Sequence, residues 1–121
     1  MTKEYYGSAK VPLTPVVRAG DYVFISGQVP FDADGNIVPG GIQAETRAVL
    51  DNLRACLDMA GCGLEDVIKT TVWLRDRDDF AAFNEVYGAA FSHNPPARSA
   101  TESRLMIDIA VEIEAIAYKP L

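Results

Sequence analysis

The pattern of apolar residues predicts two amphipathic helices. Between residues 42 and 60, apolar side chains recur at the spacing of one helical face, and glycines that suit a helix end follow at once. Farther along, aromatic residues trace the apolar face of a second, shorter helix: Phe80, Phe83, Tyr87 and Phe91. Pro95 and Pro96 cannot continue that helix, so it ends before them.

Strands are predicted where short β-rich runs lie between turn signals. The clearest runs are residues 22–25, 67–74, 97–105 and 109–118. With the helices they give the order β-α-β-α-β-β after an N-terminal strand or hairpin, and residues 31–41 read as a loop or hairpin excursion. Two amphipathic helices suit one face of one sheet, so the pattern predicts an α+β fold.

The last predicted strand has two different faces. Because side chains alternate along a strand, small and branched apolar residues share the face expected under the helices: Val111, Ile113, Ala115 and Ala117. The other face mixes carboxylates with apolar groups, and Trp73 is a candidate addition to it: Glu112, Glu114, Ile116 and Tyr118. No third helix is available to cover this half-apolar face. We therefore predict a homo-oligomer in which another subunit covers it.

Length and composition narrow the class of protein. A chain of 121 residues fits a single domain spanning residues 1–121, and 49% hydrophobic with 23% charged residues supports a packed core rather than disorder. The net charge of −6 makes nucleic acid an unfavourable partner. The sequence has neither an apolar run of membrane-spanning length nor the apolar stretch of a signal peptide, which predicts a cytoplasmic protein without a membrane partner.

Metal-binding residue types are scarce. His93 is the only histidine, which excludes any site that needs two imidazoles, and its loop surroundings predict a solvated side chain. Cys56 and Cys62 have no further ligands nearby and are expected to be small buried or half-buried thiols. The acidic run at residues 32–36 lacks the spacing and the final glutamate of a calcium loop. We expect no metal.

Five polar or small residues are candidates for chemistry. Arg98 follows the double proline, where its planar guanidinium suits a carboxylate, although a surface arginine on a strand edge fits the same position. Glu112 lies within a strand, where it would either pair with Arg98 or transfer protons, and Glu114 is an alternative acid on the same face. Ser26 and Gly27 end an early strand and either form a turn or offer polar groups to a small anion.

At these residues the sequence resembles the RidA family of enamine and imine deaminases, also called YjgF/YER057c/UK114. The similar segments are residues 25–30, 69–76, 80–91, 96–99 and 111–117. The resemblance implies a chorismate-mutase-like α+β fold with a mixed β-sheet and two helices on one face. It also implies a homotrimer whose sheets form a central β-barrel, with active sites between subunits. The implied reaction, which needs no cofactor, hydrolyses enamines and imines such as 2-aminoacrylate and 2-iminobutyrate to 2-oxo acids and ammonia.

The resemblance also implies roles for single residues. Arg98 would bind the substrate carboxylate, and Glu112 would relay protons through water. Ser26 and Gly27 would contact the substrate near its reacting carbon, and the backbone N–H groups of Gly27 and Ala100 would fix its orientation. Asn84, on the second helix, would give structural support.

The chain departs from the family pattern in three places. Val16, a substrate-contact position, replaces an aromatic residue that lines the pocket in many deaminating members, and Thr101 replaces an apolar residue. The stretch from Ser99 to Glu112 is one residue short, with Met106 where proline is frequent. These changes are compatible with a larger amino-acid-derived imine or a ring-cleavage enamine. Two other functions remain open: a non-catalytic trimer that binds small 2-oxo acids as a regulator, and a ribonuclease, which the acidic charge disfavours.

Overall fold

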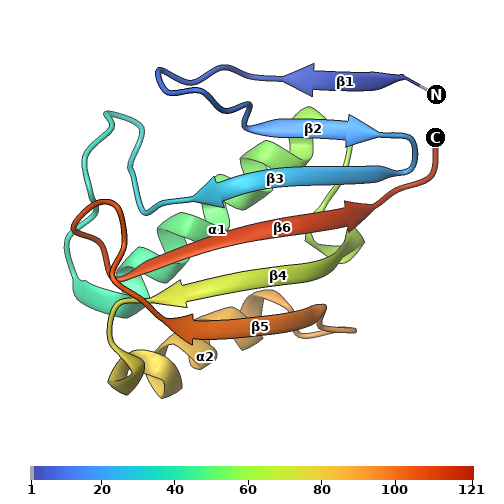
Figure 1. Cartoon of the computed structure of the whole chain (residues 1–121). Coiled ribbons are helices and arrows are strands. Elements are labelled where there is room, and N and C mark those ends of the chain that lie inside the picture. Colours follow the sequence, from blue (N-terminus) through green and yellow to red (C-terminus); the bar gives the residue numbers. More distant parts are fainter. Residues whose placement is uncertain (1) are drawn as a thin grey trace.

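A computed structural model describes residues 2–121 and places six strands in one mixed sheet. The strands are β1 (Lys3–Tyr6), β2 (Val16–Ala19), β3 (Tyr22–Gln28), β4 (Val67–Leu74), β5 (Ala97–Glu102) and β6 (Val111–Tyr118). Their order across the sheet is β1-β2-β3-β6-β4-β5 (Figure 1). Neighbouring strands are antiparallel except for β4 and β5, which run parallel because a helix carries the chain from one to the other.

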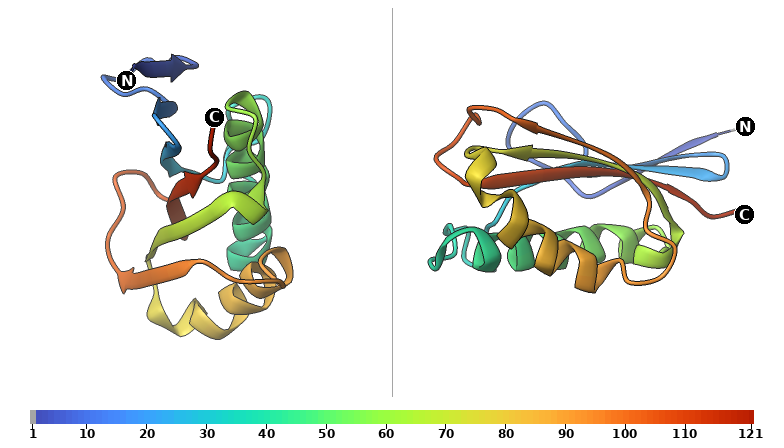
Figure 2. Two further views of the ribbon diagram at one scale, coloured as in Figure 1. Left: turned by 90° about the vertical axis from the view of Figure 1, so that its right-hand side faces the viewer. Right: turned by 90° about the horizontal axis from the view of Figure 1, so that it is seen from below.

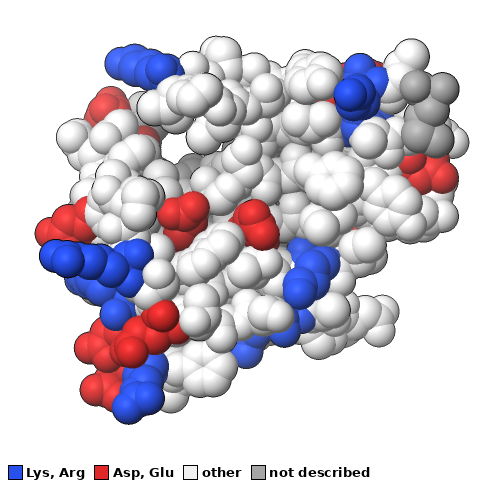
Figure 3. All heavy atoms as spheres, in the orientation of Figure 1, with Lys and Arg blue, Asp and Glu red and all other residues white. Residues whose placement is uncertain are grey.

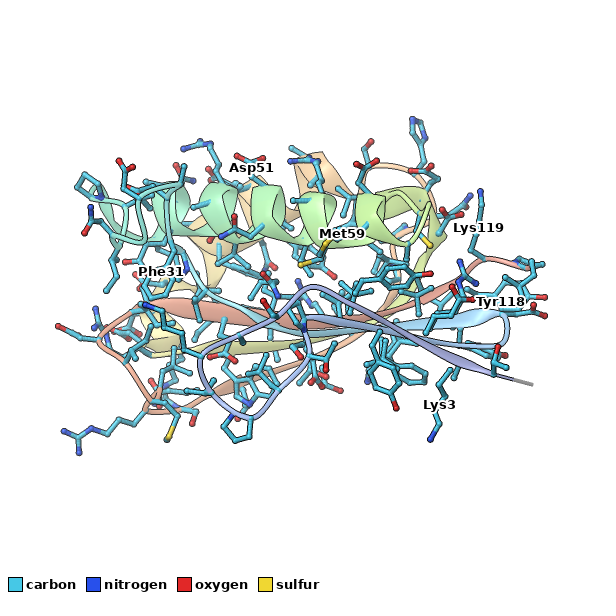
Figure 4. The ribbon with its side chains drawn as sticks, turned by 90° about the horizontal axis from the view of Figure 1, so that it is seen from above. Lys3, Phe31, Asp51, Met59, Tyr118 and Lys119 are labelled. Carbon is cyan, nitrogen blue, oxygen red and sulfur yellow. The ribbon has the colours of Figure 1, made fainter. Side chains whose placement is uncertain are left out.

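Two helices cover one face of this sheet. They are α1 (Gly41–Met59) and α2 (Phe80–Ala90), and the short 3-10 helices η1 (Leu64–Asp66) and η2 (Arg77–Asp79) precede β4 and α2. Figure 2 shows α1 and α2 on the same side of the strands. Figure 4 views the two layers edge-on, with Asp51 on the outer side of α1. The predicted α+β class, with both helices on one face of a mixed sheet, is confirmed.

The core lies between the helices and the sheet. Burial alternates along β6 as the sequence predicted, with these residues inside: Val111, Ile113, Ala115 and Ala117. They meet the apolar stripe of α1, which includes the fully buried Val49, Leu53 and Leu57. Each fully buried side chain of this kind contributes about 1.5–3 kcal/mol, so this layer is the main source of stability.

The opposite face of the sheet, here called the open face, carries exposed aromatic residues. Tyr22, Phe24 and Tyr118 project from β3 and β6 on this face and are 46%, 43% and 44% exposed. The rings of Tyr22 and Tyr118 lie 5.3 Å apart. Figure 3 looks onto this face, where uncharged atoms predominate. The prediction that the last strand has a half-apolar second face is confirmed, and such a surface is typical of an interaction site.

Two charged side chains are buried although the sequence pattern gave no sign of it. Arg18 on β2 is 5% exposed and donates hydrogen bonds to the backbone carbonyls of Gly20, Ala60 and Lys119. Glu45 on α1 accepts a 2.8 Å hydrogen bond from the N–H of Ala110, just before β6. Both side chains join segments far apart in the sequence, so their roles are structural.

The predicted strand at 97–105 ends earlier, at Glu102, and residues 103–110 form a loop before β6. Cys56 is buried, Cys62 is half-buried and His93 is exposed, as expected. No helix within residues 2–121 combines the length and hydropathy that a membrane span needs.

Candidate active site

Arg98 lies on the helix-covered side of the sheet. It sits on the edge strand β5, in register with the buried Thr70 of β4. Its Nη1 donates a 2.8 Å hydrogen bond to Oδ1 of Asn84 on α2. Asn84 therefore contacts Arg98 directly, as the structural role expected of it requires.

Three aromatic rings of α2 surround the guanidinium. The Cζ atom of Arg98 lies 4.9 Å from the ring centre of Tyr87, 5.4 Å from Phe80 and 5.8 Å from Phe83. Ring faces stabilise a cation without neutralising it. Among residues 2–121, no carboxylate pairs with Arg98; the ion pairs present belong to Arg54, Arg75 and Lys119. A half-buried cation with only neutral partners is suited to bind an anion.

Phe80 and Ala100 line an open hollow of about 420 Å³ together with five further residues: Leu74, Arg77, Asp78, Thr101 and Glu102. Ala100 follows Arg98 by two residues on β5 and so projects to the same side of the sheet. Together, Arg98, Ala100, Phe80, Asn84 and Tyr87 form what we call the Arg98 half-site. Its members come from β5 and one face of α2.

Glu112 projects from the open face, opposite Trp73 of β4. The backbone of Gly27 packs against its carboxylate: a Cβ at Gly27 would overlap Oε2 of Glu112 and lie 3.0 Å from Cδ. A larger residue at position 27 would therefore require the Glu112 carboxylate to move. We call Ser26, Gly27, Trp73 and Glu112 the Glu112 half-site.

The pKa of the Glu112 carboxyl is raised above its ordinary value. The first cause is desolvation by burial, and the second is the negative charge of Glu114. A raised pKa brings a carboxyl closer to the range in which it both donates and accepts protons near neutral pH. Glu114 is exposed. Of the two candidate acids, Glu112 is therefore the half-buried one, with the raised pKa.

The hydroxyl of Ser26 already has a partner. It donates a 2.7 Å hydrogen bond to the carbonyl of Thr14, and the Ser26 N–H donates to the carbonyl of Pro15 at 2.9 Å. Towards a ligand, the hydroxyl oxygen is therefore available as an acceptor. The backbone N–H of Ser26 is already used in the hydrogen bond to Pro15 and is not available to a ligand.

The structure gives no support for Val16 as a substrate contact. Its side chain is fully buried in the core, in register with Ile25, because this position of β2 faces the helices. The neighbouring Val17 alternates to the open face and lines a hollow there with Phe24 and Ser26.

The two half-sites lie on opposite faces of the sheet. Arg98 is in register with Thr70 on the helix side, whereas Glu112 is in register with Trp73 on the open face, and β4 separates their two strands. The alternative of an Arg98–Glu112 ion pair within one chain is wrong for this reason. A ligand that touches both residues requires two copies of the chain.

Residues 2–121 contain no cluster of three or more histidine, cysteine, aspartate or glutamate side chains placed to hold a metal ion. In the acidic loop, Asp32 accepts hydrogen bonds from the backbone N–H groups of Asp34 and Asn36. Its carboxylate therefore stabilises a local turn.

Comparisons with known proteins agree on one family. The family model described as Endoribonuclease L-PSP matches residues 6–119. The chain is 52% identical over 110 residues to a RutC family protein of Pyrococcus horikoshii, covering 89% of this chain and 87% of the relative. It is 41% identical over 112 residues to the 2-iminobutanoate/2-iminopropanoate deaminase of Escherichia coli, covering 89% and 88%. The crystal structure of RidA from an Antarctic Psychrobacter has a TM-score of 0.86 at 38% identity, covering 92% and 91% of the two chains.

Proposed function

The chain belongs to the RidA family, also described as endoribonuclease L-PSP, and from this premise we propose that it is a homotrimeric deaminase. Its substrates are reactive enamines and imines with a carboxylate next to the reacting carbon, such as 2-aminoacrylate and 2-iminobutyrate. The products are 2-oxo acids and ammonia. The name of the Escherichia coli relative supports this class of substrate.

The observation that carries the proposal is the environment of Arg98. Its guanidinium is half-buried, held by an amide oxygen and aromatic rings, and has no carboxylate partner within residues 2–121. Only Nη1 is used by Asn84, so the remaining N–H groups are available to a substrate carboxylate in charge-assisted hydrogen bonds.

The oligomer completes the site. The exposed aromatic residues of the open face favour a partner surface, and a second copy of the chain is the partner we propose. In a homotrimer, the Arg98 half-site of one subunit faces the Glu112 half-site of its neighbour. Each of the three sites then contains both residues, although no single chain brings them together.

The reaction follows from holding the substrate and moving protons. An enamine first gains a proton on its β-carbon and loses one from its nitrogen, which gives the imine. Water then adds to C2: its oxygen bonds to carbon, and one proton passes to the nitrogen through Glu112 or water. The hydroxyl proton of the carbinolamine then passes to the nitrogen, directly or through Glu112 or water, as the C–N bond breaks, which gives the 2-oxo acid and ammonia. Because the imine carbon is already electrophilic, positioning and proton transfer are sufficient.

The test is a coupled assay in which an upstream enzyme generates 2-iminobutyrate and ammonia release is followed. We expect Arg98→Ala to lower kcat/KM by at least about 100-fold, since the substrate loses its anchor. Arg98→Lys should also be poor because a point charge cannot replace the planar fork. Arg54→Ala is the matched control, because Arg54 is a surface arginine paired with Asp51 on α1. Wild-type rates in Arg98→Ala would refute the proposal.

Two further measurements, ligand binding and RNA cleavage, separate the alternatives. Binding of 2-oxobutyrate without faster imine hydrolysis would identify a non-catalytic metabolite binder. RNA cleavage that persists through purification and disappears in Arg98→Ala would identify a ribonuclease. The net charge of −6 opposes binding of a polyanion such as RNA. Of the three functions, ribonuclease is therefore the one that the sequence favours least.

A further inference from the structure

The guanidinium of Arg98 belongs to a closed ring of contacts between neighbouring residues. Asn84 accepts a hydrogen bond from it, and the ring of Tyr87, one helical turn along α2, packs over it. The hydroxyl of Tyr87 forms a 2.7 Å hydrogen bond with Oγ1 of Thr70, and Thr70 is the residue beside Arg98 in the β4–β5 ladder. The network therefore ties together all three elements of the β4-α2-β5 unit.

The partners in this network share one property: none carries a negative charge. An aspartate in place of Asn84 would have a similar shape and would hold the guanidinium more strongly as an ion pair. It would also neutralise Arg98 and place a like charge beside an incoming carboxylate. The neutral amide of Asn84 thus binds Arg98 more weakly than an aspartate would, but it leaves the positive charge of Arg98 available to a ligand.

We infer that Asn84 is a positioning residue for Arg98, and that its neutral amide, rather than its hydrogen bond alone, is what keeps the site selective for a carboxylate. The amide oxygen fixes one side of the guanidinium plane, and the aromatic rings fix its tilt. The remaining N–H groups are thereby aimed at the substrate. This inference rests on the proposed function of the Arg98 half-site.

The test compares Asn84→Asp and Asn84→Ala with the wild-type protein. One measurement is the Kd of 2-oxobutyrate by calorimetry, because this 2-oxo acid carries the carboxylate but does not react. The others are KM and kcat for 2-iminobutyrate and the thermal midpoint. Asn36→Asp is the charge control, since it adds the same negative charge in an exposed turn.

Asn84→Asp should weaken 2-oxobutyrate binding and raise KM by at least about tenfold, while its thermal midpoint stays equal or rises. Asn84→Ala should lower both the thermal midpoint and kcat/KM, because the guanidinium loses its orientation. Asn36→Asp should match wild type in the Kd of 2-oxobutyrate and in KM and kcat for 2-iminobutyrate.

The contrary outcomes are distinct. A purely structural role predicts that Asn84→Asp binds 2-oxobutyrate within about twofold of wild type, and that result would overturn the inference while leaving the proposed function intact. Wild-type protein that neither binds 2-oxobutyrate nor hydrolyses 2-iminobutyrate would instead refute the proposed function, and this inference with it.

Discussion

Gly27 and Glu112 are in contact across the β3–β6 pair, where the glycine backbone packs against the carboxylate. Any side chain at position 27 would overlap Oε2 of Glu112. The backbone therefore sets where this carboxylate lies, on the open face beside Trp73. The chemistry proposed for Glu112 depends on that placement.

Gly27→Ala should displace the Glu112 carboxylate and reduce kcat by about tenfold or more, with a smaller effect on KM, because Arg98 still anchors the substrate. Gly88→Ala on α2 is the matched control, since nothing lies within 4 Å of the added methyl group. That change should leave kcat unaltered and stabilise the helix by about 0.5–1 kcal/mol. Equal kcat values for the two variants would show that the Gly27–Glu112 contact has no functional role.

Glu112→Gln should make the protein more stable than wild type at pH values above the ordinary glutamate pKa, and it should lower the activity. Because the pKa of Glu112 is raised on folding, the folded state binds the proton more tightly than the unfolded state. Stability is therefore lost as pH rises from the ordinary glutamate pKa through the higher folded value. The gain in thermal midpoint of Glu112→Gln over wild type should grow across that interval and then level off.

Glu114→Gln provides the comparison for this pH series. It removes the second cause of the raised Glu112 pKa but leaves the desolvation, which is the larger one. Its gain in thermal midpoint should have the same sign and be smaller, at equal protein concentration. A gain for Glu112→Gln that does not vary with pH would contradict the account.

Thr70→Val should destabilise the protein by about 1–3 kcal/mol, because it leaves the buried hydroxyl of Tyr87 without its hydrogen-bond partner. Thr101→Val, at an exposed position of β5, should change stability by less than about 0.5 kcal/mol. Urea denaturation of both variants gives the comparison. If Thr70→Val cost no more than Thr101→Val, the Thr70–Tyr87 hydrogen bond would not be a stabilising part of the network.

Elements with strong apolar periodicity were predictable from the sequence. The aromatic spacing from Phe80 to Phe91 gave α2, and the alternation along β6 gave the two faces of the sheet. The candidate residues Arg98 and Glu112 were also found, because their chemistry is unusual at those positions.

The faces on which these residues lie were not predictable. The residues of β5 have no apolar alternation, so only its register beside β4 decides that Arg98 points towards the helices, and a shift by one residue would reverse this. Val16 was expected at the site from the family resemblance alone, whereas its position in β2 buries it. Arg18 and Glu45 were missed because charged residues are usually solvated, and only the folded chain shows the backbone groups that pair with them.

The central claim is that each active site takes Arg98 from one subunit and Glu112 from another. It is tested most directly by co-expressing Arg98→Ala and Glu112→Gln subunits with different tags and purifying the mixed assembly. Each variant alone should be nearly inactive. Random assembly leaves one intact site of three in every mixed trimer, so the purified mixed assembly should have about a third of the wild-type activity. Mixed assemblies no more active than the separate variants would contradict the claim.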